Sequence, residues 1–131
     1  MIAYEYNGGV AIIIPTGEIP LEDVIQKDVP PNTEYIIVTQ LPTDRFFRSC
    51  WVIQGDSVVE DLTMSREFSH NIRRQRRDAE FAPYDRLVTV PGQEESAESN
   101  RVEIRTKYDV MQTDIDSAVS TTELKQILNG L

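Results

Sequence analysis

The stretch LPTDRFFRSCW at residues 41–51 decides the fold of the first half of the chain. It leads into residues 46–54, and residues 57–61 follow shortly after; both runs are rich in the β-branched and aromatic residues that favour strands. Gly55-Asp56 joins the two runs, and a two-residue loop with glycine first is typical of a type II′ turn. The sequence therefore predicts a β-hairpin here.

The aromatic residues of this stretch are expected to form the core of the hairpin. Alternation along residues 46–54 places Phe47 and Trp51 on one face and Cys50 on the other. Trp51 and Phe47 are the predicted core anchors, and replacing a core tryptophan by alanine costs about 3–5 kcal/mol. Cys50 is predicted to be packed inside this strand. Since a buried thiol is a poor nucleophile, no reactive role is expected for it.

Three further elements are predicted upstream. Residues 2–6 and 10–14 flank Asn7-Gly8-Gly9, which tolerates the positive φ of a tight hairpin turn. Pro20 suits a first helical turn, and a short amphipathic helix should end at Pro30-Pro31. Residues 35–39 form a continuous apolar run, which favours a central strand covered on both sides. Residues 1–61 are thus predicted to be a small antiparallel β module with one short helix.

From Leu62 onward the apolar residues recur at helical spacing. A first long helix is expected to end before Pro83, with Phe68 and Ile72 on its apolar stripe as further core anchors. Residues 84–92 are expected to be a loop that could include a brief strand. A second long helix follows, and its seam contains Ala97, Ile104, Tyr108, Met111, Ile115 and Ala118.

A short last helix completes the second half. Ser120 with Glu123 three residues later is a capping-box pattern at its start. Residues 62–131 are predicted to be an antiparallel helical hairpin with this short terminal helix. The predicted fold class is therefore α+β.

The charge is unevenly distributed and argues for protein partners. The net charge is −9; residues 1–61 hold three basic and ten acidic residues, and residues 62–131 hold ten and twelve. An acidic surface repels nucleic acids and anionic membranes. The longest apolar run, residues 10–14, is too short to span a bilayer, and the first residues lack the pattern of a signal peptide. A soluble protein that folds in a reducing compartment is expected, since the chain has one cysteine.

The residues offer little for catalysis. His70 is the only histidine and Cys50 the only cysteine, so one chain cannot assemble a two-histidine metal site. His70 is interpreted as a surface or hydrogen-bonding residue. We predict no catalytic site, no metal and no cofactor.

Four arginines cluster on the first long helix: Arg73, Arg74, Arg76 and Arg77. They could neutralise phosphates, which would make the protein a nucleic-acid binder. The favoured alternative is a salt-bridged hairpin or a protein-contact surface, since Arg74 and Arg76 have acidic residues four positions later. No aromatic residues are interleaved with them as base-stacking platforms.

The seam of the second long helix also allows two interpretations. Tyr108, Met111 and Ile115 can pack against the first long helix within one chain. Alternatively, the seam exceeds the apolar stripe of that helix and leaves surface for a neighbouring subunit. Both remain open, and the four arginines and these three residues are the predicted partner contacts.

Several stretches together carry a family resemblance: LPTDRFFRSCW at 41–51, the strand pair around Gly55-Asp56, and the stretches 64–67, 71–85, 104–108 and 111–116. With these stretches the chain resembles small proteins encoded in the tail and tail-fibre regions of tailed bacteriophages, known as tail assembly chaperones or virion proteins. The resemblance covers most of residues 34–128. Cys50 stands where a small residue such as alanine is expected.

The resemblance implies a non-enzymatic protein that binds other phage structural proteins, as an oligomer or part of a larger assembly. We expect a virion protein of the tail, tail fibre or neck, made in the host cytoplasm. A transient assembly chaperone is the alternative. A DNA-binding regulator is the third possibility and depends on the arginine cluster alone.

Overall fold

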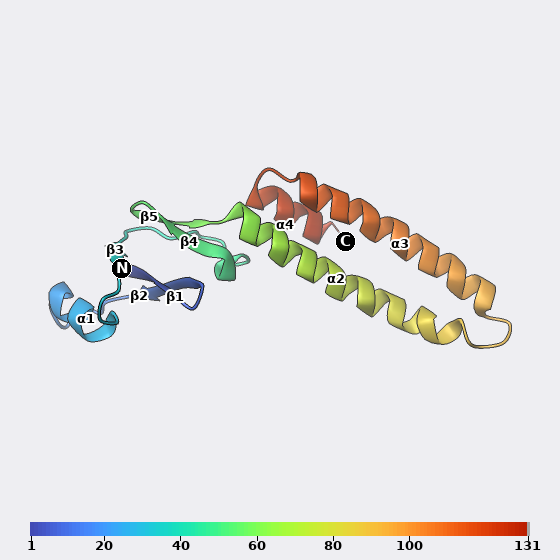
Figure 1. The fold of residues 1–131 in the computed structure, drawn as a ribbon, viewed down its shortest axis with the longest axis horizontal. Helices are drawn as coiled ribbons and strands as arrows, with labels where there is room; N and C mark the ends of the chain where they lie inside the picture. Colours follow the sequence, from blue (N-terminus) through green and yellow to red (C-terminus); the bar gives the residue numbers. More distant parts are fainter. Residues whose placement is uncertain (131) are drawn as a thin grey trace. The chain divides into compact units, whose positions relative to one another are not determined.

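The computed structural model describes residues 1–130, and the chain divides into two compact units, Met1–Asp61 and Leu62–Leu131 (Figure 1). We call them the β unit and the helical unit. Antiparallel strands are followed by helices, so the predicted α+β class is confirmed. Within residues 1–130, none of the helices is sufficiently long and apolar to cross a membrane.

The β unit is built on a three-stranded antiparallel sheet of order β2-β1-β3. Its strands are β1 (Ile2–Tyr6), β2 (Gly9–Ile13) and β3 (Tyr35–Ile37). Tyr6 pairs with Gly9, so the first hairpin has a two-residue loop. Its residues Asn7 and Gly8 have φ of 49° and 77°, the left-handed pair that a type I′ turn needs. The predicted first hairpin is confirmed.

The prediction of a central strand at residues 35–39 is wrong. β3 contains three residues and pairs with β1 alone, whereas β1 pairs on both sides and is the central strand. Tyr35 and Ile37 are 43% and 54% exposed. An apolar run indicates a strand, but strand order depends on which partners the rest of the chain supplies, and here β3 has one.

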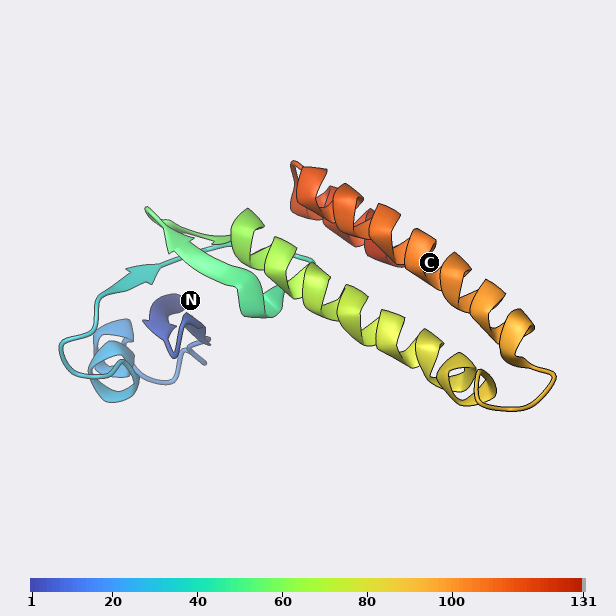
Figure 2. The same cartoon turned by 45° about the vertical axis from the view of Figure 1, so that its right-hand side comes forward.

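Two layers cover the sheet, one on each face. Ile2 and Ala3 are consecutive in β1 and therefore point to opposite faces. Ile2 packs with Val24 and Val29, from and just after α1 (Leu21–Asp28). Ala3 belongs to a second cluster with Val10, Val38, Trp51 and Val58. The hairpin of β4 (Trp51–Gln54) and β5 (Ser57–Glu60) therefore covers the opposite face (Figure 2).

The strand predicted to begin at residue 46 begins instead at Trp51. Arg48–Cys50 form a short 3₁₀ helix, η1, and the Asp44 carboxylate accepts a hydrogen bond from the Phe46 amide at 2.9 Å. Such local side-chain bonds favour a turn over a strand. Phe47, Cys50 and Trp51 are consequently all buried, rather than alternating between faces. The Gly55-Asp56 hairpin turn is as predicted, with φ of 61° at Gly55.

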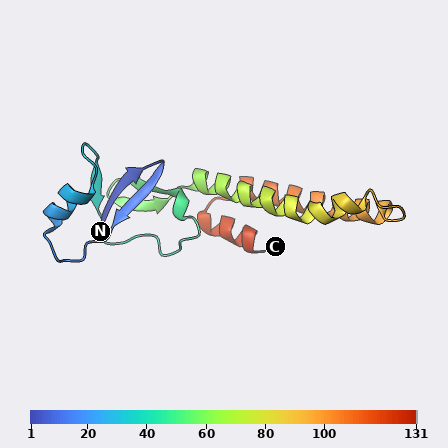
Figure 3. The same ribbon diagram turned by 90° about the horizontal axis from the view of Figure 1, so that it is seen from below.

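The helical unit is an antiparallel hairpin with a short third helix. Its elements are α2 (Leu62–Leu87), α3 (Glu94–Ser117) and α4 (Thr121–Asn129), and α4 packs against both long helices (Figure 3). Ser120 caps α4, because its hydroxyl accepts a hydrogen bond from the Glu123 amide at 3.1 Å. The Glu123 carboxylate accepts one from the Val119 amide. The predicted cap is confirmed, although its return bond goes to the residue before Ser120.

The buried stripe of α2 differs from the predicted one. Phe68 and Ile72, the expected anchors, are only partly buried. The buried residues of α2 are Ser65, Ser69, His70, Arg73 and Phe81. Four of these five side chains are polar, so α2 contributes a mainly polar surface to the core. The small serines also allow neighbouring helices to approach closely. The apolar seam of α3 and Leu124 and Leu128 of α4 supply the apolar side of this core.

The prediction that the first long helix ends before Pro83 is also wrong, because α2 continues through Pro83 to Leu87. Phe81 is buried before the proline, and Asp85 after it lies 3.1 Å from the Arg101 guanidinium of α3. These contacts on both sides hold the segment helical despite the missing amide hydrogen bond. The predicted loop therefore begins only at Val88, and residues 88–93 form turns rather than a strand.

Replacing Pro83 by alanine is expected to stabilise the helical unit. The change restores an amide that can donate to the Ala79 carbonyl, and proline is about 3 kcal/mol worse than alanine inside a helix. Because the helix has already adapted to the proline, we expect a gain of about 1–2 kcal/mol. Urea unfolding followed by helical circular dichroism measures it. A loss of stability would show that Pro83 shapes the helix in a way that packing requires.

Candidate protein-contact site

The outer edge of β3 has free backbone hydrogen-bonding groups. Met1 and Val38 exchange two hydrogen bonds: the Met1 amine donates to the Val38 carbonyl at 3.0 Å, and the Val38 amide donates to the Met1 carbonyl at 2.9 Å. Antiparallel pairing alternates, so Ile36 also faces β1 while Tyr35 and Ile37 direct their backbone groups outward. Within residues 1–130, no strand pairs with this outer edge.

The side chains of the same two residues add apolar surface beside that edge. Tyr35 and Ile37 are two positions apart, so they share one face of the sheet. They lie opposite Tyr4 and Ile2 of β1, on the face that α1 covers farther in. Since both are exposed, α1 does not shield β3, and the edge combines free backbone groups with two large apolar side chains.

A groove of about 730 Å³ lies along the start of the same strand. Its lining includes Glu5, Glu34 and Ile36, together with Ile53 and Gly55 from the β4–β5 hairpin. Tyr35 of β3 and Asn32 and Thr33 of the preceding loop complete the lining, and Asn32 adopts a left-handed φ of 59°. Two carboxylates in one groove, in a unit with three basic and ten acidic residues, suit a basic side chain.

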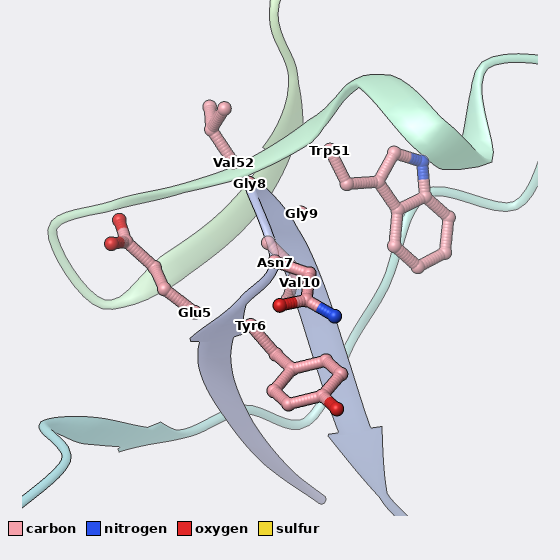
Figure 4. A pocket seen from close by; sticks show the side chains of 8 residues that line it. All are labelled: Glu5, Tyr6, Asn7, Gly8, Gly9, Val10, Trp51 and Val52. Carbon is pink, nitrogen blue, oxygen red and sulfur yellow. The ribbon is translucent and has the colours of Figure 1, made fainter.

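A second hollow of about 320 Å³ lies beside the turn between β1 and β2 (Figure 4). The side chains of Glu5 and Tyr6 point in opposite directions, as neighbours on a strand do. Trp51 also lines the hollow, and its indole nitrogen has no hydrogen-bond partner. Charged groups do not converge in this hollow, so it is the weaker candidate for a ligand.

Trp51 is fully buried and is stacked by an arginine. The Arg48 guanidinium lies 4.3 Å from the ring centroid and also donates a hydrogen bond to the Val10 carbonyl at 2.8 Å. The pair therefore ties η1 to β2 as well as to the core. Phe47 is also buried, so both predicted anchors, Phe47 and Trp51, are shielded from solvent.

His70 lies in a buried polar network of the helical unit. Its Nε2 is 2.7 Å from the Asp116 carboxylate, and its Nδ1 accepts a hydrogen bond from Arg73 Nε at 3.2 Å. Because Nδ1 is the acceptor, the ring proton lies on Nε2 and is donated to Asp116. The Nε2 contact therefore links α2 to α3, whereas the Nδ1 contact lies within α2. Burial, followed by the nearby charges of Arg74 and Arg77, lowers the pKa of Arg73.

The other arginines of the cluster have separate partners. Arg74 donates to the Asn71 side chain, Arg76 donates to the Leu128 carbonyl at 2.5 Å, and Arg77 stacks on Phe81. The predicted pairs of Arg74 and Arg76 with acids four residues later are not formed. Arg76 instead satisfies a carbonyl at the end of α4, where a cation also complements the helix dipole.

Sequence reasoning missed Arg66, which has the same role at the end of α3. Its guanidinium donates to the Ile115 carbonyl at 3.3 Å and to the Ala118 carbonyl at 2.9 Å. The unpaired carbonyls of a helix C-terminus require such a partner. A lone arginine one turn into a helix carries no sequence signal for this role, because its target lies about fifty residues away.

The seam of α3 is filled within the chain. Tyr108, Met111 and Ile115 are 2%, 3% and 0% exposed. They cannot contact a partner while the helical unit is folded, so their prediction as partner contacts is corrected in favour of the intramolecular alternative. Burial, followed by the neighbouring Glu80 carboxylate, raises the pKa of Tyr108 to about 12. Glu80 also binds Lys107 at 2.8 Å, and that contact lowers the pKa of Glu80.

Stability should therefore fall at high pH in a way that depends on Tyr108. The folded protein holds the phenol proton more tightly than the unfolded chain, so this contribution is complete below pH 10 and is lost as the pH rises through about 12. Two pKa units correspond to about 2–3 kcal/mol. Free energies of unfolding from pH 8 to 12 should show that Tyr108→Phe removes this slope. Tyr6→Phe, at an exposed tyrosine, should leave the wild-type pH dependence in place.

Other chemistry-bearing residues are dispersed or buried. Cys50 is buried in the β unit, and within residues 1–130 no three residues of the metal-binding types come together. Comparisons with protein-family models, with curated proteins and with solved structures find no match to this chain.

Proposed function

We propose that this chain is a non-enzymatic structural protein that binds other proteins in the tail, tail-fibre or neck assembly of a tailed bacteriophage. The free outer edge of β3, with the exposed side chains of Tyr35 and Ile37, is the observation that carries the binding role. Exposed edges with apolar residues pair readily with other chains. The phage assignment rests on the resemblance of residues 34–128.

The positions of the most reactive side chains support a non-enzymatic role. Both ring nitrogens of His70 are engaged, Nε2 with Asp116 of α3 and Nδ1 with Arg73 of α2, and Cys50 is buried. A general base needs a free nitrogen within reach of a substrate. Neither residue is available without disrupting the packing around it.

The arrangement of the arginine cluster favours a protein partner over nucleic acid. Arg73 is buried, Arg76 caps α4 and Arg77 stacks on Phe81, so Arg74 is the most exposed member. Phosphate binding depends on several cations acting together. The cluster has a structural role that accounts for its composition.

Quantitative mass spectrometry of purified phage particles tests the proposal. We expect the protein at a fixed copy number per particle that persists through gradient purification and moderate salt. A matched preparation from a deletion mutant should lack normal tails or fibres. If wild-type particles lack the protein and the mutant still assembles poorly, the protein is a transient chaperone. If particles assemble normally without it, the proposal is wrong.

A further inference from the structure

We propose that the outer edge of β3 binds an extended segment of a partner protein, whose side chains alternate between apolar and basic, as an added strand. This inference rests on the proposed function and names the kind of partner segment that the β unit takes. It follows from three features of the described residues: the free backbone groups, the two faces of the edge and the local charge.

The backbone of β3 is already in the conformation that a new strand needs. The amide and carbonyl groups of Tyr35 and Ile37 face outward, while Ile36 and Val38 bond toward β1. Strand addition satisfies such outward groups with main-chain hydrogen bonds. The edge has no proline, lysine or bulge within Tyr35–Ile37, the features with which proteins usually block edge pairing.

The two faces of the edge select different side chains. On one face, an added strand meets Tyr35 and Ile37, which suit apolar residues. On the other face, it borders the groove that contains Glu5 and Glu34. Successive residues of a strand point to opposite faces, so alternate apolar and basic residues would contact the two surfaces together.

Charge also favours a foreign segment over a second copy of this chain. A second β unit would bring its own three basic and ten acidic residues to an edge flanked by Glu5 and Glu34. Like charges placed close together disfavour association. A basic segment neutralises the two carboxylates instead and is attracted over a distance at low ionic strength.

Binding of synthetic peptides to the full chain tests this inference. The probe is a fluorescent peptide of alternating valine and lysine, seven residues long, followed by fluorescence anisotropy at low salt. One control peptide has glutamate in place of lysine. The other keeps the sequence but carries N-methyl groups on alternate amides, which removes the main-chain donors of one edge. We expect the first peptide to bind and both controls to bind at least about tenfold more weakly.

Two protein variants separate backbone pairing from charge. Ile37→Pro removes an outward amide and leaves the Val38 bond to Met1 in place, so affinity should fall about tenfold or more. Glu34→Lys should lower the affinity for the lysine peptide by about tenfold and raise the affinity for the glutamate peptide. Glu18→Lys makes the same charge change on an exposed loop of the β unit outside the groove lining and is the matched control.

Several results would overturn the inference. Equal binding of the N-methylated peptide would show attraction by charge alone. Unchanged affinity of Glu34→Lys for the lysine peptide would exclude the groove as part of the binding site. If Ile37→Pro does not fold, the result for Glu34→Lys alone tests the inference. A dimer in sedimentation that Ile37→Pro dissociates would assign the edge to a second copy. Mass spectrometry of particles tests the virion role separately. A negative result in the peptide experiments would therefore overturn this inference without contradicting the proposed virion role.

Discussion

Trp51→Ala is expected to unfold the β unit. The indole is fully buried among Ala3, Val10, Val38 and Val58, and the Arg48 guanidinium stacks on it. Removing such a side chain costs about 3–5 kcal/mol, through lost burial and the cavity that remains. A unit of this size has little stability beyond that. Hydrogen–deuterium exchange should show fast exchange of the amides of β1 and β4 in the variant.

Tyr6→Ala is the matched control for this prediction, since Tyr6 is an aromatic residue of the same unit and is exposed. Its effect should stay within about 0.5 kcal/mol. Slow exchange of β1 in Trp51→Ala, equal to that of the wild type, would contradict the assignment of Trp51 to the core.

Tyr108→Ala is the second large effect and should disrupt the helical unit. The ring lies in the buried seam of α3 beside Glu80, and Lys107 packs over it. Loss of a buried aromatic side chain again costs about 3–5 kcal/mol. Helical circular dichroism during urea unfolding measures the loss, while the fluorescence of Trp51 reports the β unit in the same samples.

Val110→Ala is the control on the same helix, because Val110 is exposed. It should change the free energy of unfolding by less than about 0.5 kcal/mol. If Tyr108→Ala were as stable as this control but lost binding to a partner, the residue would be a contact after all and the internal seam would be wrong.

Local signals allowed much of the fold to be predicted from the sequence. Asn7-Gly8 and Gly55-Asp56 fix two hairpin turns through backbone preferences that need no tertiary contacts. The Ser120 cap and the regular seam of α3 likewise depend on residues a few positions apart. The strands β1, β2 and β5 accordingly lie within one residue of their predicted bounds.

The errors concern features that distant contacts decide. Pro83 normally ends a helix, yet contacts on both sides keep α2 continuous. The strand pattern before Trp51 is overridden by the Asp44 turn. The polar stripe of α2 was missed because Ser69 and Arg73 find their burial only when α3 and α4 pack against them.

The candidate site itself was not predictable in the same way. The run at residues 35–37 looks like a buried strand, and whether it lies at an edge depends on the order β2-β1-β3. The groove acid Glu34 is adjacent in sequence, but Glu5 reaches the groove only through the pairing of β1 with β3. The sequence places the acidic excess in residues 1–61 but does not indicate which edge or groove of that unit is open to a partner.

Hydrogen–deuterium exchange of the free protein and of the protein in intact particles tests the central claim most directly. The amides of Tyr35 and Ile37 face outward, whereas that of Ile36 faces β1 and serves as the internal reference. We predict that the first two become strongly protected in the particle while Ile36 changes little. Unchanged exchange of Tyr35 and Ile37 in particles that contain the protein would contradict binding through the edge of β3.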